Sequence, residues 1–191
     1  MILKILTLSA LAIFYSVYLG KMIAQSRRGI RTNQLAKGNK PKQVFFTELS
    51  AKLFAYAAIV VQIISILFTS PASNIFACCF ALILFTLAIT IFSSAVYTMH
   101  DSWRAGLPEK KIALITNGIY SWSRNPAFLG FDFLHLGVMI MFFNLPLLLV
   151  SLGSIISYHM QILQEEKYLT TTFGEEYTQY NHKVRRYFGR K

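Results

Sequence analysis

Three long stretches of the chain carry no charge or almost none, and basic residues separate them. The first runs from Ile5 to Gly20, and the second covers 48 residues from Leu53 to His100. The third covers 40 residues from Asn125 to Gln164 and holds a single charge, Asp132. At a rise of 1.5 Å per residue the second stretch would make about 72 Å of helix, more than twice the roughly 30 Å hydrocarbon core of a bilayer. This stretch must therefore fold back on itself.

Two turn-like clusters divide the longer stretches. Residues 70–74 read Ser-Pro-Ala-Ser-Asn, and residues 144–146 read Asn-Leu-Pro. Turns of this composition leave apolar segments that are long enough to cross a bilayer, or close to it. We therefore predict an all-α integral membrane protein with five transmembrane helices, over residues 3–23, 50–69, 75–99, 127–143 and 146–164. The last two helices form a C-terminal hairpin.

The charges set the orientation of these helices. The chain has 19 basic and 8 acidic residues, and only 14% of its residues are charged, against about 25% in ordinary soluble domains. Eighteen of the 19 basic residues fall in residues 21–52, in residues 101–124 or in the tail from Lys167. Five spans place all three stretches on one side, which the positive-inside rule makes cytoplasmic. We expect the lipid bilayer as partner and no nucleic acid, because topology and anionic lipid already account for the net charge of +11.

A cleaved signal peptide is the alternative for the first apolar stretch. Lys4 would form its positive end, and Ala24-Gln25-Ser26 offers small residues at a plausible cleavage spacing. The basic cluster that follows the stretch outweighs Lys4, so we favour a retained helix with its N-terminus outside.

The sequence lacks the motifs of several common metal sites, nucleotide-binding sites and hydrolases. The four histidines show neither HxxxH nor HExxH spacing, and there is no GxGxxG, Walker or GxSxG motif. Cys78 and Cys79 are adjacent in an apolar stretch, where packing is a better interpretation than a disulfide or a metal site. We therefore predict no metal centre.

Short motifs gather in the last 90 residues. Gly118-Ile119-Tyr120 comes first, and the segment from Arg124 to Gly130 (Arg-Asn-Pro-Ala-Phe-Leu-Gly) begins the fourth predicted helix. After the fifth helix come Glu165-Glu166 and then Phe173-Gly174-Glu175-Glu176-Tyr177. Over about residues 97–188 the chain resembles the superfamily of isoprenylcysteine carboxyl methyltransferases and phospholipid N-methyltransferases. These membrane enzymes share a Gly-Ile/Val-Tyr segment, an Arg-His/Asn-Pro segment, a helical hairpin, and a Glu-Glu pair with a downstream Phe-Gly and two tyrosines.

The resemblance implies a function for this region. Residues 1–96 would form the N-terminal helices and a basic loop, and residues 97–191 the methyltransferase region. S-adenosyl-L-methionine would bind at the cytoplasmic end of the hairpin, and an amphiphilic, lipid-like or prenylated substrate would enter from the bilayer. The implied cofactor-binding residues are Ile112, Ala113, Leu114, Ile115, Gly118, Tyr120, Asn125, Pro126, Ala127, Phe128 and Glu165. Catalytic roles fall to Arg124, Asp132 and Glu166, and substrate contacts to Gln161 and His135.

Elementary helix chemistry is consistent with this cofactor site. Pro126 can be the first residue of the fourth helix with Asn125 as its N-cap, and the free amides of that first turn suit a carboxylate. If Glu165 and Glu166 end the fifth helix, they oppose its dipole, and a cofactor ammonium or ribose would explain them. The alternative is that these residues have no role in binding. The glutamates would then mark a solvated helix end, Arg124 would snorkel to the membrane surface, and Tyr120, Trp122 and Phe128 would belong to an interfacial aromatic belt.

Two further features stand out by their position along the chain. Asp132 is the only acidic residue inside a predicted span, with His135 one turn further on; it either contacts a substrate or hydrogen-bonds within the bundle. Leu169, Phe173, Tyr177, Tyr180, Val184 and Phe188 recur every three or four residues, which predicts an amphipathic tail helix on the cytoplasmic side.

The chain departs from the carboxyl methyltransferase branch of the superfamily. Asn125 and Phe128 stand where that branch has His and Tyr, and Gln161 stands near the place of a substrate-contacting arginine. The acceptor therefore stays open between a carboxylate oxygen and an amine nitrogen. Two other classes also stay open: a non-catalytic lipid- or partner-binding scaffold, and a nicotinamide-dependent membrane reductase, because sterol reductases look similar in this region.

Overall fold

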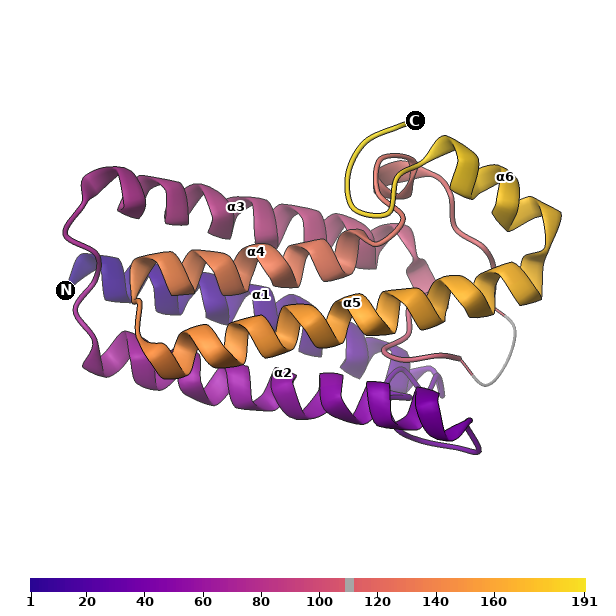
Figure 1. The fold of residues 1–191 in the computed structure, drawn as a ribbon, viewed down its shortest axis with the longest axis horizontal. Coiled ribbons are helices and arrows are strands. Elements are labelled where there is room, and N and C mark those ends of the chain that lie inside the picture. The colour runs from indigo at the N-terminus through magenta and orange to yellow at the C-terminus, as the bar shows by residue number, and fades with distance from the viewer. Residues whose placement is uncertain (109–111) are drawn as a thin grey trace.

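Five apolar helices run side by side along the molecule (Figure 1). This computed structural model describes residues 1–108 and 112–191, so Lys110 and Lys111 of the second basic stretch lie outside the described residues. The helices are α1 (Ile2–Arg27), α2 (Lys42–Phe68), α3 (Ile75–Thr98), α4 (Pro126–Met141) and α5 (Leu145–Phe173). Two short 3-10 helices, η1 (His100–Ser102) and η2 (Gly118–Ser121), lie between α3 and α4, and α6 (Glu175–Lys183) follows α5.

The two predicted turns lie where the sequence places them, and asparagine caps the helix that follows each one. Asn74 Oδ1 accepts a hydrogen bond of 2.8 Å from the amide of Phe76 at the start of α3. Asn144 Oδ1 accepts one of 2.9 Å from the amide of Leu147 at the start of α5. A backbone hydrogen bond of 2.8 Å from Ala72 N to Met141 O ties the two turns together. Side-chain capping of free helix amides therefore fixes both reversals of the chain.

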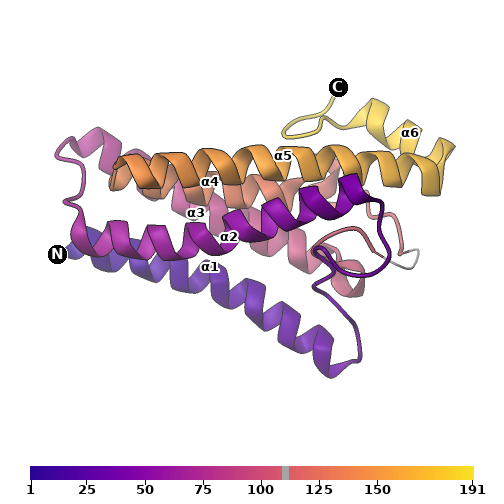
Figure 2. The ribbon, with the colours of Figure 1, turned by 60° about the horizontal axis from the view of Figure 1, so that its bottom comes forward.

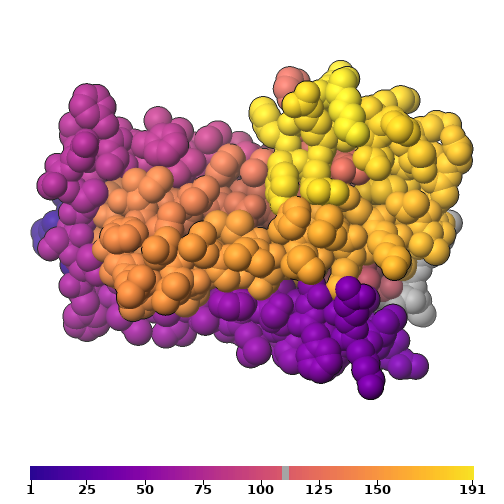
Figure 3. Space-filling view, in the orientation of Figure 1, coloured from indigo at the N-terminus to yellow at the C-terminus, as the bar shows by residue number. Residues whose placement is uncertain are grey.

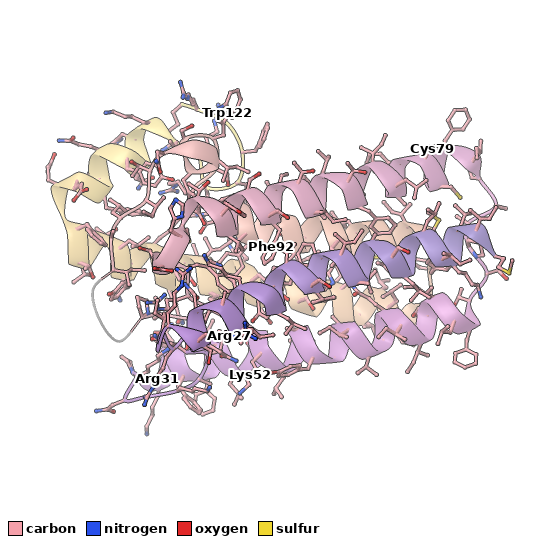
Figure 4. All side chains as sticks on the ribbon, turned by 180° about the vertical axis from the view of Figure 1, so that it is seen from behind. Arg27, Arg31, Lys52, Cys79, Phe92 and Trp122 are labelled. Carbon is pink, nitrogen blue, oxygen red and sulfur yellow. The ribbon has the colours of Figure 1, made fainter. Side chains whose placement is uncertain are left out.

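The ends of the bundle differ in charge. The N-terminus and both capped turns lie at one end, while residues 28–41, residues 99–125 and the C-terminal segment lie at the other (Figure 1). Seen from behind, Arg27, Arg31 and Lys52 lie toward the loop end, and Cys79 lies toward the end with the turns (Figure 4). The described parts of the three basic stretches therefore share one end of the molecule, the arrangement that five crossings predict.

Four of these helices, α1, α2, α3 and α5, are long and apolar enough to cross a membrane. The remaining apolar helix, α4, has 16 residues, which makes about 24 Å of helix. The fold is that of an all-α integral membrane protein, and the count of five crossings stays a prediction.

One apolar core joins the bundle. Phe14 of α1 stacks on Phe92 of α3 with ring centroids 4.5 Å apart, and Phe131 of α4 meets both rings edge-on. Glycine lets α4 come close to α3, since a Cβ atom on Gly130 would lie 2.9 Å from Phe92 Cβ and 3.1 Å from Ala88 O. Both parts of the chain, before and after residue 97, therefore contribute to the same core.

The predicted ends of α2 and α5 are wrong. The second helix begins at Lys42 rather than residue 50, because its first two turns lie among the charged loops. The fifth continues past Gln164 to Phe173 and stops at Gly174, whose φ of +54° favours glycine. The tail is not one helix either: Leu169 and Phe173 belong to α5, α6 ends at Lys183, and Phe188 is exposed.

Candidate functional site

A cavity of about 460 Å³ lies at the charged end of the bundle, among the loops and the ends of the helices. All five main helices and α6 contribute to its wall, together with residues of the two basic loops. Figure 2 shows α1 diverging from α2 toward this end, which is where both helices line the cavity. Most of the lining is apolar or aromatic, and charged side chains reach it from α2, from the loops and from α5.

Many of the sequence-predicted site residues meet at this cavity. Those that line it are Ala113, Leu114, Ile115, Tyr120, Arg124, Asn125, Ala127, Phe128, Gln161 and Glu165. Those that do not belong to its lining are Ile112, Gly118, Pro126, Asp132, His135 and Glu166. The structure thus brings together residues from one loop, the start of α4 and the outer part of α5.

Tyrosines of α6 close one side of the cavity. Tyr177 and Tyr180 are buried against Leu114, Leu169 and Phe173. The hydroxyl of Tyr180 donates a hydrogen bond of 2.6 Å to the carbonyl of Tyr120, which fixes the loop that precedes α4. Burial raises the pKa of the Tyr177 phenol to about 12, so this hydroxyl keeps its proton at neutral pH.

An ionic triad links the loop before α4, the helix α5 and the C-terminal segment. Arg124 Nη2 lies 3.0 Å from Glu166 Oε1, and Arg186 holds both oxygens of the same carboxylate at 3.0 and 2.8 Å. The side chain of Arg124 is only 6% exposed, so its interpretation as a snorkelling anchor is wrong. Its Nε is buried and has no partner among the described residues.

Glu165 has different surroundings from its neighbour. Its carboxylate accepts a hydrogen bond of 3.0 Å from Gln161 one turn earlier and lines the cavity, without an ion pair to any described residue. The prediction that Glu165 and Glu166 end the helix and oppose its dipole is wrong. Helix α5 continues for two more turns to Phe173, so the two glutamates lie inside it and not at its C-terminal end.

The start of α4 confirms one half of the predicted cap. Pro126 is the first residue of the helix, with Asn125 in the N-cap position. The Asn125 side chain does not cap the helix, however, and instead donates a hydrogen bond of 3.2 Å to the carbonyl of Arg186. The C-terminal segment is held against this loop by a second hydrogen bond, which the Arg124 amide donates to Arg185 O at 3.2 Å. The Asn125 side chain therefore bonds to the C-terminal segment and not to the helix. Figure 3 shows the C-terminal residues and α6 gathered over this end of α5.

Asp132 and His135 lie outside the cavity and do not bond each other. The ring of His135 is buried and lies 2.7 Å from the amide nitrogen of Gln62 on α2, so it joins two helices. Asp132 Oδ1 is buried without a partner in the described parts of the chain. The prediction of a hydrogen bond between Asp132 and His135 is wrong. The alternative, a hydrogen bond between helices, holds for His135, which bonds to Gln62 of α2.

Glu48, which none of the sequence motifs singles out, organises the loops over the cavity. Its carboxylate is buried and accepts from Lys40 Nζ at 2.7 Å, from the Ala36 amide at 2.8 Å and from the Leu107 amide at 2.7 Å. Glu48 is the only acidic residue between Lys21 and Lys52, and that isolation was the available signal.

The two loops that Glu48 joins also bond to each other directly. The Gln34 amide donates to the carbonyl of Ala105 at 2.8 Å, and the Ala105 amide donates to that of Thr32 at 3.0 Å. Gly106, with φ of +92°, allows the close contact, since a Cβ atom there would lie 2.9 Å from the Leu35 nitrogen. Loop residues Asn33, Leu35, Trp103 and Ala105 are thereby held in the cavity wall.

Comparison with known proteins identifies the class to which this fold and site belong. The sequence model of the phospholipid methyltransferase family matches residues 76–176, just over half of the chain. The chain therefore belongs to the phospholipid methyltransferase family. The match begins inside α3, earlier than the resemblance that starts near residue 97, and ends at the second residue of α6.

The chain is also similar to particular enzymes of known activity. It is 38% identical to the protein-S-isoprenylcysteine O-methyltransferase of Saccharomyces cerevisiae over 78 residues, which are 40% of this chain and 32% of that protein. It is 39% identical to the enzyme of the same name from Schizosaccharomyces pombe, over 37% of this chain and 30% of that one. The Xenopus laevis enzyme is 38% identical over 37% of this chain and 25% of its own length. Each match thus covers less than a third of the relative.

Proposed function

We propose that this protein is an integral membrane methyltransferase that uses S-adenosylmethionine to methylate a lipid-like or prenylated amphiphile. The observation that carries the proposal is the meeting of the family motifs at one cavity, which is lined by Tyr120, Asn125, Ala127, Phe128 and Glu165. These residues come from η2, the start of α4 and α5, and they are separated by up to 45 positions in the sequence. A cavity of about 460 Å³ lies within the usual range for small-molecule sites.

The polar groups of the cavity fit this cofactor. S-adenosylmethionine carries an ammonium, a carboxylate and a sulfonium. The Glu165 carboxylate, which has no ion pair with a described residue, would bind the ammonium or the ribose hydroxyls. The first turn of α4, which no side chain caps, and the unpartnered Nε of Arg124 would bind the carboxylate. Tyr120 and Phe128 offer aromatic faces for the sulfonium.

The remaining contribution of the protein is alignment and the exclusion of water. When bound, S-adenosylmethionine supplies a methyl group that a nucleophilic atom of the acceptor takes up in line, while the sulfur keeps the bonding electron pair. The triad of Arg124, Glu166 and Arg186 holds one side of the cavity rigid, and Tyr180 fixes the backbone of Tyr120. Such pre-organisation reduces the entropy cost of bringing two reactants together. A mainly apolar wall would help to keep competing water away.

The acceptor decides whether a base is needed. A carboxylate acceptor is already a nucleophile, whereas a protonated amine must first lose a proton. Asp132 and Glu166 were the predicted bases, but neither belongs to the cavity lining. Glu165 is the acidic residue of the lining within the described chain, so it is the group that would accept the proton of an amine.

The site would face the cytoplasm. The segments that carry the described basic residues of the three stretches lie at the same end as the cavity, and basic residues flank membrane helices mainly on the cytoplasmic side. The methyl donor would then reach the site from the cytoplasm, and the amphiphile from the bilayer.

Calorimetric titration of the purified protein in detergent tests the proposal. S-adenosylhomocysteine should bind, and NADPH should not. Binding of NADPH alone would support a reductase, and binding of neither compound would support a scaffold without catalysis. Incubation of the protein with a lipid extract and a radiolabelled methyl donor would then identify the acceptor by its label.

A further inference from the structure

Three helices each bury a polar side chain in the middle of the bundle, outside the cavity. Gln62 of α2 and His135 of α4 are 0% exposed, and Ser151 of α5 is 1% exposed. The amide nitrogen of Gln62 lies 2.7 Å from His135 Nδ1, so two of these residues are in direct contact. None of the three lines the cavity, and the proposed reaction uses none of them.

The turns at the far end of the bundle place all three residues at one depth. Helices α2 and α4 end there, and α5 begins there (Figure 1). The Asn144 amide donates hydrogen bonds to Thr69 Oγ1 at 3.3 Å and to Phe142 O at 3.1 Å, which aligns the three helix ends. Seven residues are about two turns, or about 10.5 Å, so each helix then presents nearly the same face again. Seven residues into each helix from these ends come the three buried polar residues: Gln62, His135 and Ser151.

Each of these side chains has a buried polar atom without a partner among the residues that the structure describes. The three atoms are Gln62 Oε1, His135 Nε2 and Ser151 Oγ. An amide nitrogen can only donate, so His135 Nδ1 accepts from Gln62 and the proton of the neutral ring is on Nε2. The three residues therefore offer an acceptor on Gln62, a donor on His135 and a hydroxyl that can act as either.

This set of atoms matches water better than other ligands. A buried polar group without a hydrogen bond destabilises a folded protein, and inside a bilayer no solvent relieves the cost. A water molecule has two donors and two acceptors and usually binds two to four polar groups in a protein interior. The proton on His135 Nε2 would repel a cation, and an apolar ligand would leave all three atoms unsatisfied.

We propose that Gln62, His135 and Ser151 bind water inside the membrane-spanning bundle. The water accepts a hydrogen bond from His135 Nε2 and donates to Gln62 Oε1, and the Ser151 hydroxyl completes its hydrogen bonds. The ring of Tyr158, which lines the cavity, stacks on His135 with ring centroids 5.9 Å apart. The bound water therefore holds α2 to the α4–α5 hairpin next to the cavity wall. This site is independent of the proposed reaction.

The ring of His135 provides the first measurement. The substitutions His100→Gln, His159→Gln and His182→Gln leave His135 as the only histidine, which is labelled with 15N. Two-bond 1H–15N correlations in detergent then show which ring nitrogen is protonated, and we expect Nε2. A rotating-frame Overhauser experiment should show dipolar contact between this proton and water, with a sign opposite to that of proton exchange.

Two serines of α5 provide a second measurement. If Ser151 Oγ has no partner, Ser151→Ala removes an unsatisfied group and favours helix, so the melting temperature should rise. If water is bound, the same substitution removes a hydrogen bond, and the melting temperature should fall by about 2–4 °C. The contact between His135 and water should weaken as well. Ser154→Ala is the matched control, because Ser154 is buried but donates to Val150 O at 2.9 Å, and it should leave the His135 signals unchanged.

A proton on Nδ1, or an Nε2 proton without dipolar contact to water, would overturn the proposal. An equal or higher melting temperature for Ser151→Ala would overturn it as well. If Ser151→Ala does not fold, the spectrum of the protein with Ser151 intact still decides. Neither measurement needs S-adenosylhomocysteine, so failure of the methyltransferase proposal would leave this result unaffected.

Discussion

At the scale of single residues, two neighbouring glutamates illustrate how position on a helix decides the chemistry of a side chain. Successive residues of an α-helix point about 100° apart, so Glu165 and Glu166 face different surroundings. Glu165 faces the cavity and accepts one hydrogen bond from Gln161. Glu166 faces Arg124 and Arg186 and is saturated by them. We infer a binding role for the first and a positioning role for the second.

Glu165→Gln should lower the affinity for S-adenosylhomocysteine without destabilising the fold. The substitution keeps size and removes the charge, and a hydrogen bond to a charged group is worth about 1.5–3 kcal/mol, or roughly 10- to 150-fold in affinity. The melting temperature should stay the same or rise, because a partly buried carboxylate without a counter-ion is costly. Calorimetry and thermal melting measure both effects. Glu175→Gln, an exposed residue of α6, is the matched control, and parental affinity in Glu165→Gln would refute the assignment.

Glu166→Gln should do the opposite and mainly destabilise the protein. It leaves Arg124, 6% exposed, without its counter-ion, and removal of one partner of a buried pair costs about 3–5 kcal/mol. Arg186→Gln should cost about 1 kcal/mol or less, because Arg186 is 36% exposed and Arg124 still holds the carboxylate. Chemical or thermal unfolding in detergent compares the two variants. If Glu166→Gln melts like the parent, the triad does not stabilise this end of the bundle.

At the scale of elements, the sequence predicts apolar helices better than it predicts their ends. Loss of charge over a long stretch indicates a membrane segment, and the asparagines of the two turns mark where α3 and α5 begin. The end of α5 was misplaced because polarity marks the membrane surface, whereas backbone hydrogen bonds can continue in water until Gly174 stops them. With 29 residues, α5 is about 44 Å long and extends beyond a hydrocarbon core of roughly 30 Å.

The sequence predicts only those site residues that belong to short local motifs. The motif around Asn125 and the Glu165–Glu166 pair lie beside or within the cavity wall, since their sequence patterns fix short helical segments. Glu48 was not singled out, because its role depends on two loops that meet from distant parts of the chain. A pairing between Gln34 and Ala105 crosses 71 positions and leaves no local periodic signal.

Glycines set how closely two of the helices pack, and this makes a prediction for α4. Gly130→Ala should destabilise the protein by about 1–3 kcal/mol, because the new Cβ would lie 2.9 Å from Phe92 Cβ and 3.1 Å from the backbone oxygen of Ala88. Gly20→Ala in α1 is the control, since no atom lies within 4 Å of its Cβ position. Its melting temperature should be unchanged or slightly higher, as alanine favours helix. Equal melting temperatures for both variants would mean that α3 and α4 can separate without cost.

At the scale of the whole molecule, one asymmetry connects fold and function. One end of the molecule holds the cavity, the loops that cover it and the described basic residues of the three stretches. The other end has two short turns, and an asparagine caps the helix that follows each of them. Lys4 lies near that other end, where its ammonium donates a hydrogen bond of 2.8 Å to Leu67 O. In the proposed reaction, a soluble cofactor and a lipid-borne acceptor would meet at the basic end, where the cavity lies.

This asymmetry predicts which parts of the chain a membrane-impermeant reagent reaches in intact cells. Cys78 and Cys79 are free, so both are first replaced by alanine, and single cysteines are introduced at Ser73 and at Gly38. Ser73 lies in the turn between α2 and α3, and Gly38 in the basic loop before α2. A maleimide that cannot cross the bilayer should label Ser73→Cys in intact cells and Gly38→Cys only after permeabilisation, because basic loops stay cytoplasmic. Labelling of Gly38→Cys in intact cells, with Ser73→Cys protected, would invert the protein and place its cavity outside, away from the cytoplasmic methyl donor.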